Sequence, residues 1–291
     1  MKQTTEEYQG TVLEQRIDDA ISTKDAAALC DELCRRSGLP GPRANTGLVW
    51  AFGELCGLRG EKSDPLIRSL MRLEADEAPG GSALEILPMC GVAAATQRAA
   101  HDPKAQRWAL PLLHDACEDL RYRVRETVAH GLGKLGARMG DALVHETAAW
   151  TDGYFHAATV VQALGEREWQ AAITQDDEAV LRIHEAFDLL KNAQRAAARY
   201  PGHKALVEAL VRTSPQLVLR FGAGMLRELE LRAASKDPDI RAIVEKVIDG
   251  TQIRSRFPED HAAITRVLGT MAPKARDPGK ELRPTRKRGR R

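Results

Sequence analysis

The chain has 291 residues, enough to bury a sizeable core in one or two domains. Its formal net charge is +2, but residues 273–291 carry nine Lys/Arg against two Asp/Glu, which leaves the other 272 residues net acidic. Any interaction with nucleic acid therefore depends on this tail or on local patches. Five cysteines form no paired framework, the N-terminus is polar, and no apolar stretch reaches the roughly 18 residues of a membrane span. We expect a cytoplasmic protein with free thiols and no membrane association.

Strong helix formers dominate the composition, and aromatic residues make up only 4%. We expect a flexible leader at 1–10, a helical domain over 11–272 and a disordered basic tail at 273–291. Apolar spacings of four and seven predict a helical region over 11–36, which GLPGP at 38–42 ends. A helix near 48–58 follows, and Asp64 and Pro65 are expected to begin the next one, with Asp64 as N-cap. APGGS at 78–82 is a soft internal boundary.

Ten further helices are predicted beyond this boundary, separated by short loops rich in Asp, Gly and Pro: 83–100, 104–117, 121–136, 140–150, 154–165, 177–199, 203–212, 215–234, 239–249 and 259–270. Short loops make successive helices antiparallel neighbours. Pairs that cannot bury their apolar faces alone stack into a solenoid. An irregular helical bundle is the alternative.

The segment DLRYRVRETVAHGLGKL, at 119–135, follows a helical stretch and resembles a HEAT repeat. In that family an Asp in the turn precedes an aliphatic residue and an Arg by five and six positions, which here are Asp119, Val124 and Arg125. Asp119 is expected to cap the second helix, and Arg125 to bond across to a neighbouring turn. The resemblance implies an all-α, right-handed solenoid of irregular helical pairs.

Other segments match the repeat more loosely. Asp176, Leu181 and Arg182 have the same offsets, and a third unit keeps Ile240 and Arg241 but has Ser235 at the Asp position. A fourth, at 151–164, has Asp152 but lacks the arginine. The period is irregular, and about a third of the chain is covered.

No catalytic, cofactor-binding or metal-ligating residue is predicted. Cys30 and Cys34 share a helical face but lack two further ligands. His130 follows Glu126 by four residues and His145 follows Asp141 by four, which predicts pairing along each helix. Adjacent residues such as His114 and Asp115 point apart on a helix. GLGKLG, at 131–136, superficially resembles a phosphate loop, but it lies inside an expected helix, where its glycines permit close helix packing.

Four tryptophans raise an enzymatic alternative. The HEAT-like alkylpurine DNA glycosylases line a groove with Trp, Arg and Asp, and this chain has Trp108, Trp150, Asp152 and Arg125. No stretch matches the motifs of that family residue by residue, so no role is carried over. Indoles that fill the core are the simpler interpretation.

Basic residues provide the nucleic-acid alternative. Arg121 and Arg123 form a local cluster with Arg125 that could contact an anion. The tail adds further candidates for contacts with nucleic acid: Arg283, Arg286, Lys287, Arg288, Arg290 and Arg291. No aromatic residue interleaves with them, so base-specific contacts are not expected. The leading hypothesis is a non-enzymatic scaffold that presents a concave surface to a protein partner, with no cofactor or small-molecule substrate.

Overall fold

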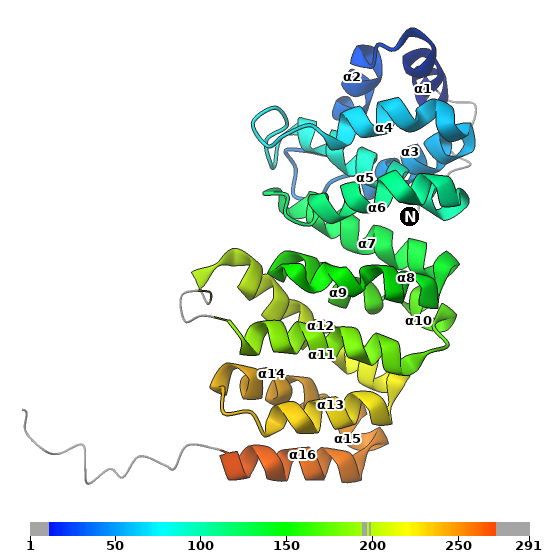
Figure 1. The fold of residues 1–291 in the computed structure, drawn as a ribbon. Helices are drawn as coiled ribbons and strands as arrows, with labels where there is room; N and C mark the ends of the chain where they lie inside the picture. Colours follow the sequence, from blue (N-terminus) through cyan, green and yellow to red (C-terminus); the bar gives the residue numbers. More distant parts are fainter. Residues whose placement is uncertain (1–11, 194–196, 198, 272–291) are drawn as a thin grey trace, which may run out of the picture.

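The computed structural model describes residues 12–193, 197 and 199–271, and the chain is all-helical over these residues, with no strand among them (Figure 1). The expected leader at 1–10 and basic tail at 273–291 lie outside the described residues. None of the described helices is long and apolar enough to cross a membrane.

Most helices lie in two layers, stacked in chain order along one axis (Figure 1). Each helix of the first layer packs against the next: α3 (Thr46–Arg59), α5 (Ile86–His101), α7 (Tyr122–Met139), α9 (Tyr154–Leu164), α12 (Pro201–Phe221) and α14 (Pro238–Ile248). The second layer covers one side of the first: α4 (Asp64–Met71), α6 (Pro103–Ala116), α8 (Asp141–Glu146), α11 (Asp176–Lys191), α13 (Ala223–Ala233) and α16 (Pro258–Met271).

Shorter elements complete the stack. α1 (Val12–Thr23) and α2 (Ala27–Arg35) precede α3, so the expected helical region over 11–36 is two helices. The six-residue helices α10 (Arg167–Ala172) and α15 (Thr251–Arg256) were not expected from the sequence. Longer helices are also connected by 3₁₀ turns at η2 (Gly60–Ser63), η3 (Ala83–Glu85) and η4 (Thr147–Asp152).

Helix starts follow capping chemistry in several places. Asp102 accepts a hydrogen bond from the amide of Lys104 at 2.9 Å before α6, and Asp237 accepts one from Asp239 at 2.8 Å before α14. Each cap precedes a proline at the first helical position. The expected N-cap role of Asp64 is wrong, because Asp64 is itself the first residue of α4 and accepts a bond from Arg98 Nε at 2.7 Å.

The chain does not break at Pro215, where the sequence predicts one helix to end and another to begin. Pro215 lies inside α12, which continues to Phe221. An internal proline costs about 3 kcal/mol because it removes a backbone donor and crowds the preceding turn. Burial of Leu217 and Val218 in the following turn offsets that cost.

One hydrophobic core extends from Leu13 in α1 to Ile264 in α16. The expected soft boundary at 78–82 does not interrupt it, because α3 and α4 before this loop both pack against α5 after it.

Deeper in the stack, α7 and α10 approach closely at Gly136. A Cβ on Gly136 would lie 2.2 Å from the ring of Trp169, which is fully buried and donates from Nε1 to the carbonyl of Gly140 at 3.2 Å.

Candidate functional site

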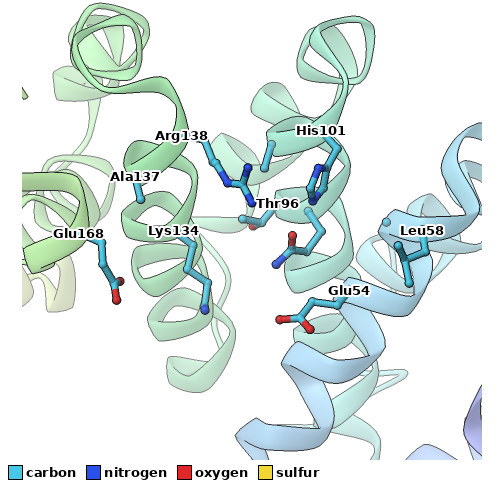
Figure 2. Close-up of a pocket in the computed structure, with 11 residues that line it drawn as sticks. Glu54, Leu58, Thr96, His101, Lys134, Ala137, Arg138 and Glu168 are labelled. Carbon is cyan, nitrogen blue, oxygen red and sulfur yellow. The ribbon is translucent and has the colours of Figure 1, made fainter. Parts of the chain in front are cut away.

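The uncovered side of the first layer carries a groove between α3, α5 and α7, with a volume of about 730 Å³ (Figure 2). Charged and polar side chains from separate helices project into it: Glu54 from α3, His101 from α5, and Lys134 and Arg138 from α7. Glu168 of α10 lines one end. Leu58, 72% exposed, adds apolar surface. The groove is therefore amphipathic, with both signs of charge.

Most charged groups of this groove have no internal partner. Within the described part of the chain, Glu54, His101, Arg138 and Glu168 make no hydrogen bond or ion pair. Lys134 is the exception, because its ammonium lies 5.0 Å from the ring centroid of Trp50. These groups are free to meet charges on another molecule.

Trp50 is also part of an aromatic and ionic contact beside the groove. His130 meets its ring edge-on, with centroids 5.1 Å apart, and His130 Nδ1 lies 3.1 Å from Glu166 Oε1. The hydrogen bond with His130 lowers the pKa of Glu166 below its ordinary value. The expected pairing of His130 with Glu126 is wrong, because Glu126 instead accepts a bond from the hydroxyl of Tyr122.

Two further hollows continue the groove along α7, α9 and α12. Their volumes are about 450 and 260 Å³, and shared lining residues make all three contiguous: Glu168, Gln162 and Arg212. We call this surface the α3–α12 face. Its six cations are Arg125, Lys134, Arg138, Arg167, Lys204 and Arg212, and its five anions are Glu54, Glu126, Glu166, Glu168 and Glu208. This near balance gives no strongly positive field of the kind that phosphate backbones attract.

The residues of the expected repeat signature make contacts within the chain. Arg125 donates to the carbonyl of Asp119, and Arg241 donates to the carbonyl of Ser235 at 2.7 Å, so each bonds six residues back within its own turn. The expected bond of Arg125 to a neighbouring turn is therefore wrong. Asp119 accepts from the backbone amide and Nε of Arg121, just before α7 begins, rather than from the free amides of the helix. Val124 is buried.

The looser unit does not repeat this geometry. Asp176 is the first residue of α11 and forms an ion pair with Arg220 at 3.2 Å. Arg182 lies buried in the interior of α11, where its Nη2 is 2.9 Å from Glu185 Oε1. This unit therefore matches the repeat in sequence offsets but not in hydrogen bonding.

The candidate anion-binding residues are already engaged or lie outside the described residues. Arg121 is 5% exposed, and its guanidinium bonds Asp119 and the carbonyls of Leu73, Glu74 and Ala78. Arg123 forms an ion pair of 3.0 Å with Glu85. The tail candidates fall within 272–291: Arg283, Arg286, Lys287, Arg288, Arg290 and Arg291.

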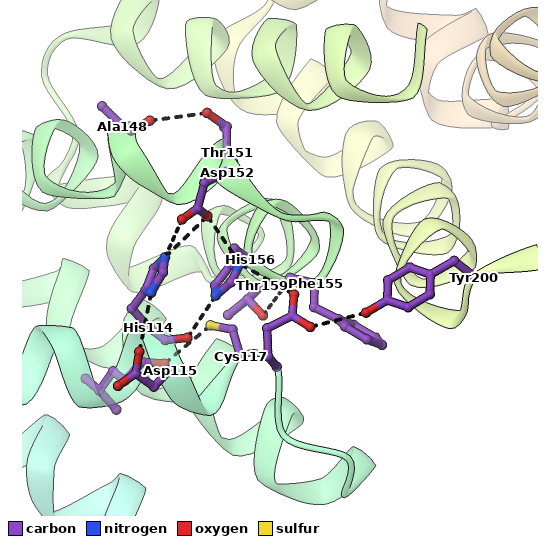
Figure 3. A network of polar contacts seen from close by, with 12 residues as sticks. His114, Asp115, Cys117, Ala148, Thr151, Asp152, Phe155, His156, Thr159 and Tyr200 are labelled. Atoms are coloured by element: carbon purple, nitrogen blue, oxygen red, sulfur yellow. Dashed lines mark hydrogen bonds and ion pairs between the residues drawn. The ribbon is translucent and has the colours of Figure 1, made fainter. Parts of the chain in front are cut away.

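A second polar cluster lies at the edge of the stack, where the end of α6 meets the start of α9 (Figure 3). His114 Nε2 is 3.1 Å from Asp152 Oδ2, and His156 Nδ1 is 3.2 Å from Asp152 Oδ1. Glu118 Oε1 lies 3.6 Å from the same nitrogen of His156. Ligand atoms of His114, Asp152 and His156 all lie within 4.8 Å of one another, so these three residues could hold a metal ion.

His156 is held rigidly in this cluster. Its Nε2 lies 3.1 Å from the carbonyl of His114, and its ring stacks on that of His114 with centroids 3.9 Å apart. Burial, together with the neighbouring His114, lowers the pKa of His156. A Cβ on Gly153 would lie 2.5 Å from Nδ1, so the chain can approach His156 here only with glycine.

Sequence reasoning missed this cluster. Asp152 and His156 are four residues apart, the same spacing that we used to propose other histidine pairs, and this was the only available signal. His114 lies 38 residues before Asp152 and joins it only through packing of α6 against the following units. The second pair proposed from spacing also differs, since the carboxylate within ion-pair distance of His145 is Glu178, at 3.9 Å.

The aromatic and charged residues of the glycosylase alternative do not form one groove. Trp150 packs edge-on against His114 beside Asp152, whereas Trp108 stacks with Arg68 of α4. Arg125 lies over the ring of Phe155, with its guanidinium carbon 4.3 Å from the centroid. No protein-family model matches the chain, and comparisons with the curated proteins and with the solved structures found no match.

Proposed function

We propose that this chain is a non-enzymatic scaffold of HEAT-like helical pairs, an α-solenoid that presents its α3–α12 face to a protein partner. Stacked pairs with one continuous core favour a solenoid. The bonds from Arg125 and Arg241 to the carbonyls six residues earlier recur 116 residues apart, which favours repeated units.

The groove between α3, α5 and α7 carries the proposal. Glu54 on one wall and Arg138 on the other have no internal partner among the described residues, and the exposed Leu58 offers apolar contact. A protein surface with a carboxylate opposite Lys134 and Arg138, a cation opposite Glu54 and an apolar side chain between them fits this arrangement. The near balance of charge favours such a partner over nucleic acid.

Affinity capture with matched variants tests the proposal. The double variant Lys134→Glu/Arg138→Glu reverses the basic wall, and Lys104→Glu/Arg107→Glu makes the same charge change on the exposed side of α6. We expect proteins captured by the unchanged chain to be lost with the first variant and kept with the second. The proposal is wrong if both variants capture the same proteins as the unchanged chain.

Fluorescence anisotropy tests the nucleic-acid alternative. The full chain and residues 1–272 are titrated with duplex DNA and single-stranded RNA at low and moderate salt. Binding that needs the tail and weakens steeply with salt would favour the alternative, because it reports phosphate neutralisation by Lys and Arg. We expect neither protein to show such binding.

A further inference from the structure

We propose that His114, Asp152 and His156, with Glu118 beside them, form a binding site for one divalent transition-metal ion of the zinc class. Two imidazoles and a carboxylate suit Zn²⁺ and neighbouring first-row metals, whereas Ca²⁺ and Mg²⁺ prefer all-oxygen sites. This inference is independent of the proposed partner-binding face, because the cluster uses neither the groove nor its charged walls.

The main evidence for the site is that the buried nitrogen His156 Nδ1 lacks a hydrogen-bond partner. The ring is only 7% exposed, and its Nε2 lies 3.1 Å from the carbonyl of His114, which can only accept a hydrogen bond. Nε2 therefore bears the hydrogen, and in the neutral ring Nδ1 bears a lone pair. That nitrogen has no hydrogen-bond partner, although it faces Asp152 at 3.2 Å and Glu118 at 3.6 Å. A lone pair that faces two carboxylates is satisfied by a cation between them, either a metal ion or a proton on Nδ1.

The hydrogen bond at the other ring nitrogen of His156 also suits a metal ligand. Metal-bound histidines commonly donate their other ring N–H to a backbone carbonyl, which fixes the tautomer and the ring orientation. His156 makes this bond to the carbonyl of His114, a second residue of the same cluster. Gly153 keeps a side chain away from the nitrogen that would bind the ion.

The spacing of ligand atoms agrees with a tetrahedral ion on two edges. Zn–N and Zn–O bonds of about 2.0–2.1 Å place tetrahedral ligands roughly 3.3 Å apart. Asp152 Oδ1 lies 3.3 Å from His114 Nε2 and 3.2 Å from His156 Nδ1, so one oxygen can form both edges. Glu118, 3.6 Å from His156, is close enough to supply a fourth ligand.

Binding requires one local movement. The rings of His114 and His156 are stacked at an interplanar angle of 11°, so their lone pairs cannot meet at one ion in this arrangement. The His114 side chain is the more exposed of the two, and rotation of its ring out of the stack would turn Nε2 toward the ion. The carboxylate of Asp152, which is also exposed, can follow that movement.

Zn²⁺ and Co²⁺ titrations of the chelator-treated full chain test the site. Calorimetry should give one Zn²⁺ per chain, and Co²⁺ should give visible d–d absorption that Zn²⁺ displaces. Asp152→Asn and His114→Gln should each weaken binding at least tenfold while keeping the helical circular dichroism. His145→Ala is the matched control, because His145 also lies near a carboxylate but has no third ligand within the described residues.

Each other outcome overturns the inference. It fails if Zn²⁺ does not bind, which would mean that a proton alone occupies His156 Nδ1. It also fails if Asp152→Asn and His114→Gln bind as tightly as His145→Ala. A thiolate-to-cobalt charge-transfer band that survives in Asp152→Asn would place the ion on cysteines instead, with Cys30 and Cys34 the adjacent pair.

Discussion

Replacing Gly136 with alanine should destabilise the protein, although alanine is the better helix former. In an open helical position, Gly→Ala stabilises by about 1 kcal/mol. Here the new methyl group would lie 2.2 Å from the ring of Trp169, a distance that the structure cannot accept without movement. The ring is fully buried and bonded to the carbonyl of Gly140, so it cannot turn away freely.

The two effects oppose each other, and overpacking dominates. Forcing an extra carbon into a packed core costs about 1–3 kcal/mol, and the direct overlap with an aromatic ring places this site near the upper limit. After the gain in helix propensity, we expect a net loss of about 2 kcal/mol in the free energy of unfolding. Gly269→Ala in α16 is the control, because no neighbouring atom of the described residues lies within 4 Å of its new Cβ.

Urea unfolding followed by circular dichroism measures both variants. We expect a lower midpoint for Gly136→Ala at an unchanged slope, and a midpoint equal to or slightly above that of the unchanged chain for Gly269→Ala. If Gly136→Ala proved as stable as the unchanged chain, the close approach of α7 and α10 would be refuted.

Three further outcomes are expected. Arg121→Ala should lower the free energy of unfolding by about 3 kcal/mol in urea titrations, because it leaves Asp119 without its buried cation and leaves three loop carbonyls without a donor. Arg107 is exposed, so Arg107→Ala should leave the free energy of unfolding nearly unchanged. Hydrogen bonds from Thr174 lower the pKa of Asp141 in the folded protein. The contribution of Asp141 to stability is therefore complete above its unfolded pKa of about 3.9, and it is lost as the pH falls through the lower folded pKa. Asp141→Asn should flatten the decline of the urea midpoint below about pH 4, and an equally steep decline would contradict this. Alkylation of the folded protein near pH 8, followed by mass spectrometry, should modify the half-buried Cys30 and Cys34 first. Burial shields the other three thiols and raises their pKa, to about 12 for Cys117. Equal alkylation rates at all five cysteines would contradict the burial of Cys56, Cys90 and Cys117.

Sequence reasoning located the long helices well where local chemistry marks their ends. The expected helix at 104–117 is Pro103–Ala116, and that at 239–249 is Pro238–Ile248, because an Asp–Pro pair defines each start. It failed at Pro215, where burial on both sides maintains a helix that local propensity would end. α10 and α15 are too short to show a period.

The candidate sites were less accessible to sequence reasoning. Arg121 looked like a surface cation because nothing in its neighbourhood reveals that three carbonyls of the 73–78 loop will surround it. The α3–α12 face is built from residues up to 162 positions apart, such as Glu54 and Gln216. Which exposed charges share a groove depends on helix packing, and packing partners are not encoded in local spacing.

The construction of the groove has a mechanical consequence. Its walls are α3 and α7, and its floor is α5, so no flexible loop determines its width. The distance between Glu54 and Lys134 instead depends on the angles at which three successive helices cross. A change in the angle at which α5 crosses α3 or α7 would therefore widen or narrow the groove. The close approach of Gly53 in α3 to Ala93 in α5 fixes how near these two helices lie, and it therefore sets the position of the α3 wall.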